Sequence, residues 1–321
     1  MEVQLGRIGE RDIIERIRGM YPYAWPDDDC FYFPSGDRYI LLKTDSISGA
    51  SHIPKGSDPE RAGYFFAAIN LSDIAAMGGT PRYFMAAMTM PRDTPLSFLR
   101  AVERGIYKCL SRYGARMAGG DLKEGKEMAF AGIAVGVVDK DKMLRRKGAR
   151  AGDLLCVTGR LGKNAAAYHM WRKTGQRKWA NMLLEVEPKV REGQALHRLG
   201  ATSAIDLSDG VYSSIYQLRR INGKGFEIDL SKLPLHREAV RAGNGLGIAI
   251  EELALNFGGE YEILFTIPAR RYVMATTYMK RRGMSMTAIG RVTGTENILI
   301  KDGRRIPIRN RGYEHFMRRV G

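Results

Sequence analysis

Residues 62–80 (AGYFFAAINLSDIAAMGGT) form an apolar stretch that predicts a long helix, and Asp73 is its only charged side chain. Burying an unpaired carboxylate costs several kcal/mol or shifts its pKa until it is neutral, so Asp73 requires a cation or hydrogen-bond donors opposite it. Asn70 lies one turn earlier on the same face and offers a second oxygen. Taken alone, Asp73 also fits a buried capping or core network that holds no ligand.

Four more acidic sites are predicted where a strand or a helix ends. Asp206 and Asp209, in AIDLSDG, bracket the start of a predicted helix, and either also fits a simple N-cap. Asp121 follows two glycines, which allow the backbone to come close to a ligand. The remaining two sites are the run 27–29 (DDD) and the pair 44–45 (TD), which follows a predicted strand.

These five sites occur in a chain with a formal net charge of +16, so surface solvation explains them poorly. Clustered Asp, with Thr and Asn but no His or Cys nearby, is the ligand set that hard cations such as Mg²⁺ prefer, usually together with substrate phosphates. We therefore expect several Mg²⁺ ions and a nucleoside triphosphate. Backbone N–H groups after Ser208 would hold phosphate, and Arg145 or Arg146 would give it a bidentate contact.

Other phosphate-binding and catalytic signatures are missing from the sequence. Residues 159–164 (GRLGKN) lack the spacing and the ending of a P-loop, and residues 243–247 (GNGLG) do not complete GxGxxG. The HRD and DFG segments of protein kinases and the HExxH zinc signature are also absent. The three cysteines, Cys30, Cys109 and Cys156, form no CxxC pair, which is typical of a reducing cytosol and argues against structural zinc.

The order of the predicted elements indicates an α/β (α+β) protein of two domains, assigned to residues 1–140 and 150–321. The charged, glycine-punctuated run 139–153 supplies the boundary. Helices are predicted at 9–20, 60–77, 95–113 and 162–173, and after Ser208 and Arg270. Strands are predicted at 38–43, 83–90, 130–138, 154–158, 203–205, 226–228, 261–267 and 287–292, with 119–121 in a connection.

The longest apolar run, 129–138, is about half the length of a bilayer span, and the N-terminus lacks a signal-peptide core. We therefore expect a soluble, cytoplasmic protein. Residues 266–321 hold thirteen Lys or Arg and three Asp or Glu. This basic end is compatible with a nucleic-acid-binding surface, or with a solvated surface that attracts anionic substrates.

Nine short motifs follow one another over nearly the full length of the chain. They are GE at 9–10, DDC at 28–30, TD at 44–45 with His52, NLSDIAAMG at 70–78, GGD at 119–121, RKGA at 146–149, DLSDG at 206–210, GGEYE at 258–262 and GYEHF at 312–316. In this order they resemble the thiamine-monophosphate kinase family, part of the aminoimidazole ribonucleotide synthetase-like superfamily. His52, GGEYE and GYEHF are the features that indicate the thiamine enzyme within that superfamily.

The resemblance implies Mg²⁺ ligands at Asp28, Thr44, Asp45, Asp73, Asp121, Asp206 and Asp209. It implies ATP contacts at Gly120, Asp121, Arg146 and Ser208. It implies thiamine monophosphate contacts at His52, Glu260 and Tyr313. The family transfers the γ-phosphoryl group of ATP directly and in line to the substrate phosphate, without a covalent phosphoenzyme. Its N-terminal α/β domain dimerises through its sheets and is followed by a C-terminal α/β domain, so the resemblance implies a homodimer.

Two alternatives stay open beside this one. The chain could be another ATP-dependent enzyme of the superfamily that acts on a different small phosphorylated substrate, since the loop 46–53 (SISGASHI) and Leu122 depart from the family pattern. It could also be a basic nucleic-acid-binding protein. Because GGEYE is one residue shorter than the commoner GGEDYE, either Glu260 or Glu262 could contact the substrate.

Overall fold

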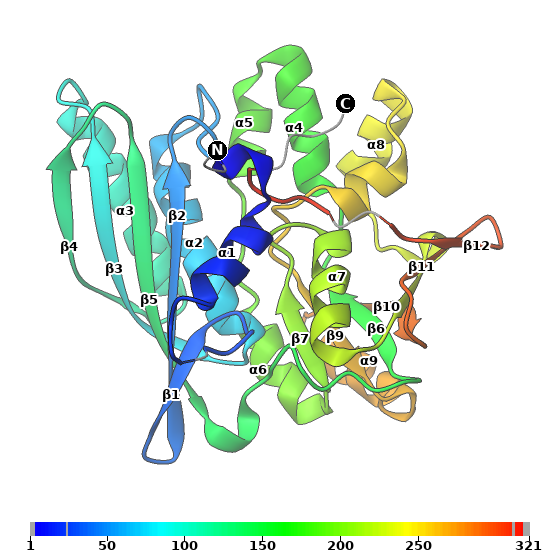
Figure 1. The fold of residues 1–321 in the computed structure, drawn as a ribbon. Helices are drawn as coiled ribbons and strands as arrows, with labels where there is room; N and C mark the ends of the chain where they lie inside the picture. The colour runs from blue at the N-terminus through cyan, green and yellow to red at the C-terminus, as the bar shows by residue number, and fades with distance from the viewer. Residues whose placement is uncertain (1–3, 24, 310–311, 317–321) are drawn as a thin grey trace.

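A computed structural model gives the fold for residues 4–23, 25–309 and 312–316. Two β-sheets lie side by side, and the helix α2 (Pro59–Ala76) stands between them (Figure 1). The N-cap of α2 is Asp58, whose side chain accepts a hydrogen bond from the backbone N–H of Glu60. Beyond its first turn nearly every residue of α2 is buried, because it packs on the first sheet on one side and on β7 and α6 of the second on the other. The mixed α/β fold with two sheets confirms the predicted fold class.

The first sheet has five strands in the order β1-β2-β5-β3-β4, and all neighbours are antiparallel except β3 and β4. Its strands are β1 (Phe31–Ser35), β2 (Arg38–Ser48), β3 (Thr80–Met90), β4 (Arg116–Glu124) and β5 (Ala129–Asp139). Buried and exposed residues alternate along β3 and β5, so one face is covered and the other is bare. The helices α2 and α3 (Leu96–Arg112) cover the inner face, and α3 does so through the apolar stripe that begins at Val102 (Figure 1).

The second sheet has seven strands in the order β12-β11-β8-β10-β6-β9-β7. Its strands are β6 (Leu154–Thr158), β7 (Ser203–Asp206), β8 (Phe226–Asp229), β9 (Ile263–Ile267), β10 (Met286–Val292), β11 (Ile298–Lys301) and β12 (Arg304–Pro307). The strands β6 and β9 are buried on both faces, which explains their largely apolar sequences, and the edge strand β7 is also buried. Leu155 and Val157 face one core, while Cys156 faces the other.

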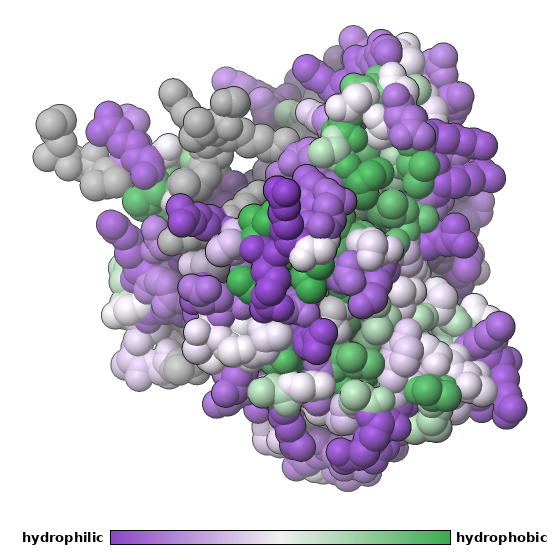
Figure 2. Space-filling model, turned by 90° about the vertical axis from the view of Figure 1, so that its right-hand side faces the viewer, coloured by the Kyte–Doolittle hydropathy of each residue, from purple (hydrophilic) through white to green (hydrophobic). Residues whose placement is uncertain are grey.

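Helices of the second half cover both faces of the seven-stranded sheet. The core that contains Val157 also holds residues of α7, and the core that contains Cys156 holds residues of α6 and α9. The helices are α4 (Lys163–Thr174), α5 (Arg177–Leu183), α6 (Val190–Leu199), α7 (Val211–Asn222), α8 (Arg237–Leu246) and α9 (Tyr272–Arg281). Near the N-terminus, α1 (Glu10–Arg18) lies against α7 through the ion pair between Glu15 and Arg220. Hydrophilic side chains predominate on the face around α8, β11 and β12, with apolar ones in small groups between them (Figure 2).

Three local predictions are wrong. The pair 44–45 lies inside β2, and 119–121 lies inside β4, because strand pairing continues through these polar and glycine residues. The N-cap of α7 is Gly210, which makes no side-chain capping bond, so neither Asp206 nor Asp209 is an N-cap. The strands β1, β11 and β12 and the helices α5, α6 and α8 are not anticipated. The division into domains at 1–140 and 150–321 stays a prediction.

In the described part of the chain, no helix combines the length and the apolar character that a membrane crossing requires.

Candidate active site

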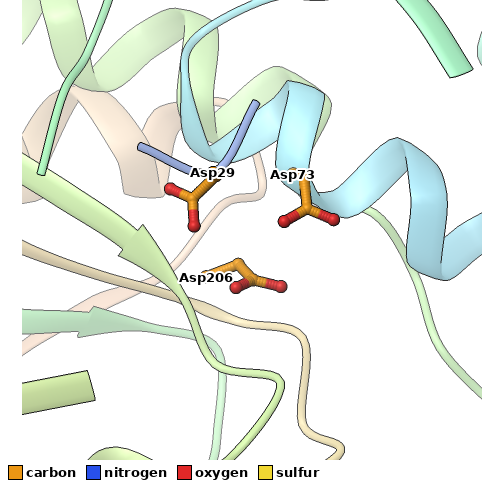
Figure 3. Close-up of side chains that lie close together, drawn as sticks. All are labelled: Asp29, Asp73 and Asp206. Carbon is orange, nitrogen blue, oxygen red and sulfur yellow. The ribbon is translucent and has the colours of Figure 1, made fainter. Parts of the chain in front are cut away.

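Three buried carboxylates, those of Asp29, Asp73 and Asp206, converge between the two sheets (Figure 3). One oxygen from each lies within 4.8 Å of the others. Asp29 precedes β1, Asp73 lies near the end of α2, and Asp206 is the last residue of β7. The Oδ2 atoms of Asp73 and Asp206 are buried and have no hydrogen-bond partner among the described residues. We call these three carboxylates the acidic centre, which has unused acceptor capacity for a cation.

Electrostatic strain accompanies this convergence. Burial, together with the neighbouring charge of Asp29, raises the pKa of Asp206 to about 7, against the opposing effect of Lys43 and Arg146. Burial also raises the pKa of Asp73 well above its ordinary value, with a smaller contribution from Asp206. Both carboxyl groups therefore hold protons more tightly than a solvated Asp does, and a bound cation would favour their ionised forms.

Arg146 fixes the position of Asp29. Its Nη2 and Nε atoms donate to Asp29 Oδ1 at 2.6 and 3.1 Å, and its Nη1 atom donates to Gln217 at 2.9 Å. The neighbouring Asp28 points elsewhere, because its Oδ1 accepts from the backbone N–H of Arg146 at 2.8 Å and its Oδ2 from Arg145 at 3.0 Å. The geometry thus places Asp29 in the acidic centre and gives Asp28 the role of anchoring the 145–146 segment.

Successive side chains of β2 point to opposite faces of the sheet, and this separates two predicted metal ligands, Thr44 and Asp45. Asp45 shares the inner face with the buried residues Leu41 and Ile47, while Thr44 is exposed and faces outward. Asn70 Oδ1 accepts the backbone N–H of Asp45 at 2.9 Å, and Asn70 Nδ2 donates to the helix backbone. Asn70 therefore orients Asp45 from α2, in place of the direct ligand role suggested by its spacing.

A lysine that the sequence reasoning missed stands inside the site. Lys43, on the inner face of β2, places Nζ 3.0 Å from Asp73 Oδ1 and 3.3 Å from Asp45 Oδ1. Burial would lower its pKa, but the carboxylates of Asp73, Asp45 and Asp206 outweigh burial and raise the pKa well above its ordinary value. The sequence did indicate this position, because residues 43 and 45 of a strand lie on the same face.

The DLSDG and GGEYE segments lie against each other. A Cβ atom on Gly258 would be 2.3 Å from the carbonyl oxygen of Ser208, so only glycine allows this approach. The backbone N–H of Gly259 donates to Ser208 at 2.6 Å, and that of Tyr261 donates to Leu207 at 2.9 Å. Ser208 Oγ in turn lies 3.3 Å from Asp206 Oδ1 and donates to it.

Tyr261 is a second residue of the site that the sequence reasoning missed. Its φ of 51° is in the left-handed region, which is uncommon for a residue other than glycine and concentrates at functional sites. Its ring packs edge-on against Phe65 of α2 at 6.1 Å between centroids. Burial raises its pKa, and the carboxylates of Asp45, Asp206 and Asp209 add to that effect.

The two glutamates of GGEYE have different surroundings. Glu262 accepts from Thr158 Oγ1 at 2.6 Å and lies 3.1 Å from Lys189 Nζ, so its carboxylate is paired inside the second half. Glu260 accepts the backbone N–H of Asn164 at 3.1 Å, at the start of α4. Burial raises the pKa of Glu260 to about 7, although the nearby ammonium of Lys163 lowers it.

The last described segment reaches the loop that carries His52. The imidazole rings of His52 and His315 are 6.3 Å apart between centroids, and Tyr313 Oη lies 3.2 Å from His315 Nδ1. The backbone N–H of Glu10 donates to the carbonyl of His315 at 3.1 Å, and Arg11 donates to the carbonyl of Tyr313 at the same distance. The first and last motifs of the sequence thus meet beside the predicted substrate residue.

A cleft of about 700 Å³ opens beside the acidic centre. Asp28, Asp29, Lys43 and Arg146 line it, together with the aromatic side chains of Tyr21, Tyr23 and Trp25. This volume is in the range of sites for nucleotide-sized ligands.

Comparisons with known proteins agree over nearly the whole chain. A family profile described as "AIR synthase related protein, N-terminal domain" matches residues 26–138. A thiamine-monophosphate kinase of Methanospirillum hungatei is 32% identical over 306 residues, which are 95% of this chain and 99% of the relative. The thiamine-monophosphate kinase of Pyrococcus horikoshii is 34% identical and covers 90% of each chain.

The chain belongs to the thiamine-monophosphate kinase family.

A solved structure, AaThiL complexed with AMPPCP and TMP, superposes with a TM-score of 0.87 at 25% identity and covers 98% of this chain and 99% of its own. Membership of the thiamine-monophosphate kinase family confirms the resemblance drawn from the nine motifs, and it makes the chain an enzyme of the kinase class.

The fold brings several of the predicted site residues of this kinase together and separates others. Asp73, Asp206, Arg146 and Ser208 meet in or next to the acidic centre, while His52 and Tyr313 lie on either side of His315. By contrast, Asp121 is 59% exposed on β4, at three strand spacings from β2, or about 14 Å. Asp121, its neighbour Gly120 and Thr44 lie outside the acidic centre of this chain.

Proposed function

We propose that this kinase transfers the γ-phosphoryl group of ATP directly and in line to the phosphate of thiamine monophosphate, forming thiamine diphosphate in a Mg²⁺-dependent reaction. The observation that carries the proposal is the acidic centre, where two buried carboxylate oxygens lack partners among the described residues. The motifs that build it occur in a chain that matches thiamine-monophosphate kinases over 90% or more of its length.

The ligand set fits Mg²⁺. Among the described residues, the potential ligands that converge at the acidic centre are carboxylate oxygens, without a thiolate or an imidazole, and such sets suit hard cations. Asp29, Asp73 and Asp206 would hold the ion, with Asp45 and Asp209 close enough to influence the same group of charges. When bound, Mg²⁺ neutralises charge between the two phosphate groups.

The cleft supports a position for ATP. The part of its lining beside the acidic centre would receive the triphosphate, and Tyr21 and Trp25 in the same lining offer ring surfaces for a base. Arg145, about half exposed, pairs with Asp28 of the cleft lining and has a guanidinium that can turn to a phosphate. Contacts of ATP with Gly120 and Asp121 stay predictions.

His52, Tyr313 and His315 support a position for thiamine monophosphate. The charge of Asp45 acts on His52, and the charge of His315 acts on Asp209, so this group borders the acidic residues from the side of the C-terminal segment. In-line transfer requires the attacking oxygen of the acceptor phosphate and the leaving oxygen of ADP on opposite sides of the transferred phosphorus, and the cleft and this group would supply these two directions of approach. Between the two glutamates left open by the sequence, the geometry favours Glu260, because Glu262 is already paired.

A second copy of the chain would cover the outer face of the five-stranded sheet. Five large apolar side chains on that face are between 40% and 52% exposed: Phe31, Phe33, Tyr83, Met85 and Ile133. Strand pairing puts Met85 opposite Ile133, and Tyr83 in one row with Phe31, so the side chains form one continuous patch. We propose that this patch is the homodimer interface.

Incubation of the purified protein with ATP, Mg²⁺ and thiamine monophosphate, followed by chromatography, tests the reaction. We expect thiamine diphosphate from the wild type, none after chelation of Mg²⁺, and a loss of at least about 100-fold in Asp206→Asn. Arg237→Gln, which changes an exposed residue of α8, serves as the control. Binding of ATP without formation of thiamine diphosphate would contradict the substrate assignment and favour another enzyme of the superfamily.

A further inference from the structure

The charges around the acidic centre do not balance. Among the described residues, three carboxylates converge there, Lys43 joins one of them to a fourth, and Arg146 pairs with another. The carboxylates belong to Asp29, Asp45, Asp73 and Asp206, and the cations to Lys43 and Arg146. With every group ionised, two negative charges remain uncompensated, which is the charge that one divalent cation supplies.

The two carboxylate oxygens of Asp73 have different surroundings. Its Oδ1 atom lies 3.0 Å from Lys43 Nζ, while its Oδ2 atom is buried without a partner among the described residues. A carboxylate between two divalent ions would use its oxygens in the same divided way. Lys43 also contacts Asp45, so its ammonium bridges two carboxylates as a metal ion would.

We infer that the Lys43 ammonium is a permanent cation of the site and takes the place of one divalent ion between Asp73 and Asp45. The inference rests on the proposed function for its Mg²⁺ site and refines it: the chain alone binds one divalent cation, at Asp29, Asp73 Oδ2 and Asp206. The remaining ions needed for phosphoryl transfer arrive with ATP.

Titration of the nucleotide-free protein with Mn²⁺, followed by electron paramagnetic resonance of the unbound ion, tests this inference. We expect one tightly bound Mn²⁺ per wild-type chain and two in Lys43→Met, which is unbranched and one atom shorter than lysine and removes its charge. Lys43→Arg keeps the charge and should bind one. Lys108→Met should also bind one, because Lys108 pairs with Glu60 on the surface, away from the acidic centre.

Two results would overturn the inference: two Mn²⁺ ions on the wild type, or the same number on Lys43→Met as on the wild type. Thermal unfolding covers the case in which Lys43→Met does not fold without metal. Recovery of its fold by Mn²⁺ supports the inference, and failure at every Mn²⁺ concentration overturns it, because a divalent ion then cannot replace the ammonium. The number of bound Mn²⁺ ions is measured without ATP or thiamine monophosphate. It therefore tests the role of Lys43 even if the protein does not form thiamine diphosphate.

Discussion

Arg146 Nη2 and Nε both donate to the same oxygen of Asp29, at 2.6 and 3.1 Å. Hydrogen bonds between ionised groups are the strong ones, and here the guanidinium fixes the carboxylate from one side only. Arg146 is 17% exposed and Asp29 only 1%, so the pair is shielded from water. Because Arg146 also donates a hydrogen bond to Gln217 of α7, the orientation of Asp29 depends on contact between the two halves of the molecule.

Exchanging Asp29 or Asp28 for Asn should separate the roles of these adjacent residues. Asp29→Asn removes a charge from the acidic centre, so we expect thiamine diphosphate formation to fall at least about 100-fold and the Mn²⁺ affinity of the chain to fall with it. Asp28→Asn weakens only the anchor on Arg145 and Arg146, so we expect a loss of at most about tenfold and normal Mn²⁺ binding. Steady-state assays and parallel Mn²⁺ titrations measure both effects. A larger loss of activity and of Mn²⁺ affinity in Asp28→Asn than in Asp29→Asn would show that Asp28 is the ligand.

The C-terminal contact of the site depends on Gly312. Its φ is 76°, and a Cβ atom there would lie 2.4 Å from the backbone nitrogen of Ser213. We expect Gly312→Ala to displace Tyr313, raise the KM for thiamine monophosphate several-fold and cost about 1–2 kcal/mol of stability. Gly303→Ala is the matched control, since Gly303 has a φ of 73° with nothing within 4 Å, and it should leave KM unchanged.

Charging the bare sheet face should dissociate the dimer. Met85 and Ile133 are direct neighbours across β3 and β5, so Met85→Lys with Ile133→Lys places two like charges in the middle of the proposed interface. We expect light scattering to give a monomer for this double variant and a dimer for the wild type. Val273→Lys, at a residue 74% exposed on α9, should stay dimeric. A wild type that is monomeric at every concentration would refute the interface.

Short-range patterns predicted the elements well because their causes are local. The apolar run of α2 and the strand β6 are found almost as predicted, and Asp73 does meet a cation. The errors come from long-range pairing. The position of Asp29, and not Asp28, in the acidic centre is not visible in a DDD run, because the direction of each carboxylate is set by Arg145 and Arg146, more than a hundred residues away in sequence. A ligand role for Asp28 stays a prediction.

The site shows the same division between local and long-range causes. Alternate residues of a strand share a face, so the position of Lys43 beside Asp45 could have been predicted from the sequence. Tyr261 was not, because its left-handed backbone follows from contacts between the GGEYE segment and Leu207.

The buried carboxyl group of Glu260 should give the protein a measurable dependence of stability on pH. Its pKa is about 7 in the folded protein, above the ordinary 4.5, chiefly because of burial. Below the unfolded value both states are protonated, and the full stabilisation is present. As the pH rises toward 7, the unfolded chain releases the proton first, so the contribution of Glu260 declines and is lost above the folded value. The difference corresponds to a loss on the order of 3 kcal/mol.

Urea unfolding in the presence of a chelator, between about pH 5 and about pH 8, measures this decline. Glu260→Gln keeps the shape of the side chain and removes the ionisation, so the variant should lose less stability than the wild type over the same range. Glu127→Gln changes an exposed glutamate and should follow the wild type. The other buried carboxyl groups contribute equally to both proteins. If the free energy of unfolding falls with pH equally steeply in Glu260→Gln and in the wild type, Glu260 is ionised in the folded chain and is held by Lys163.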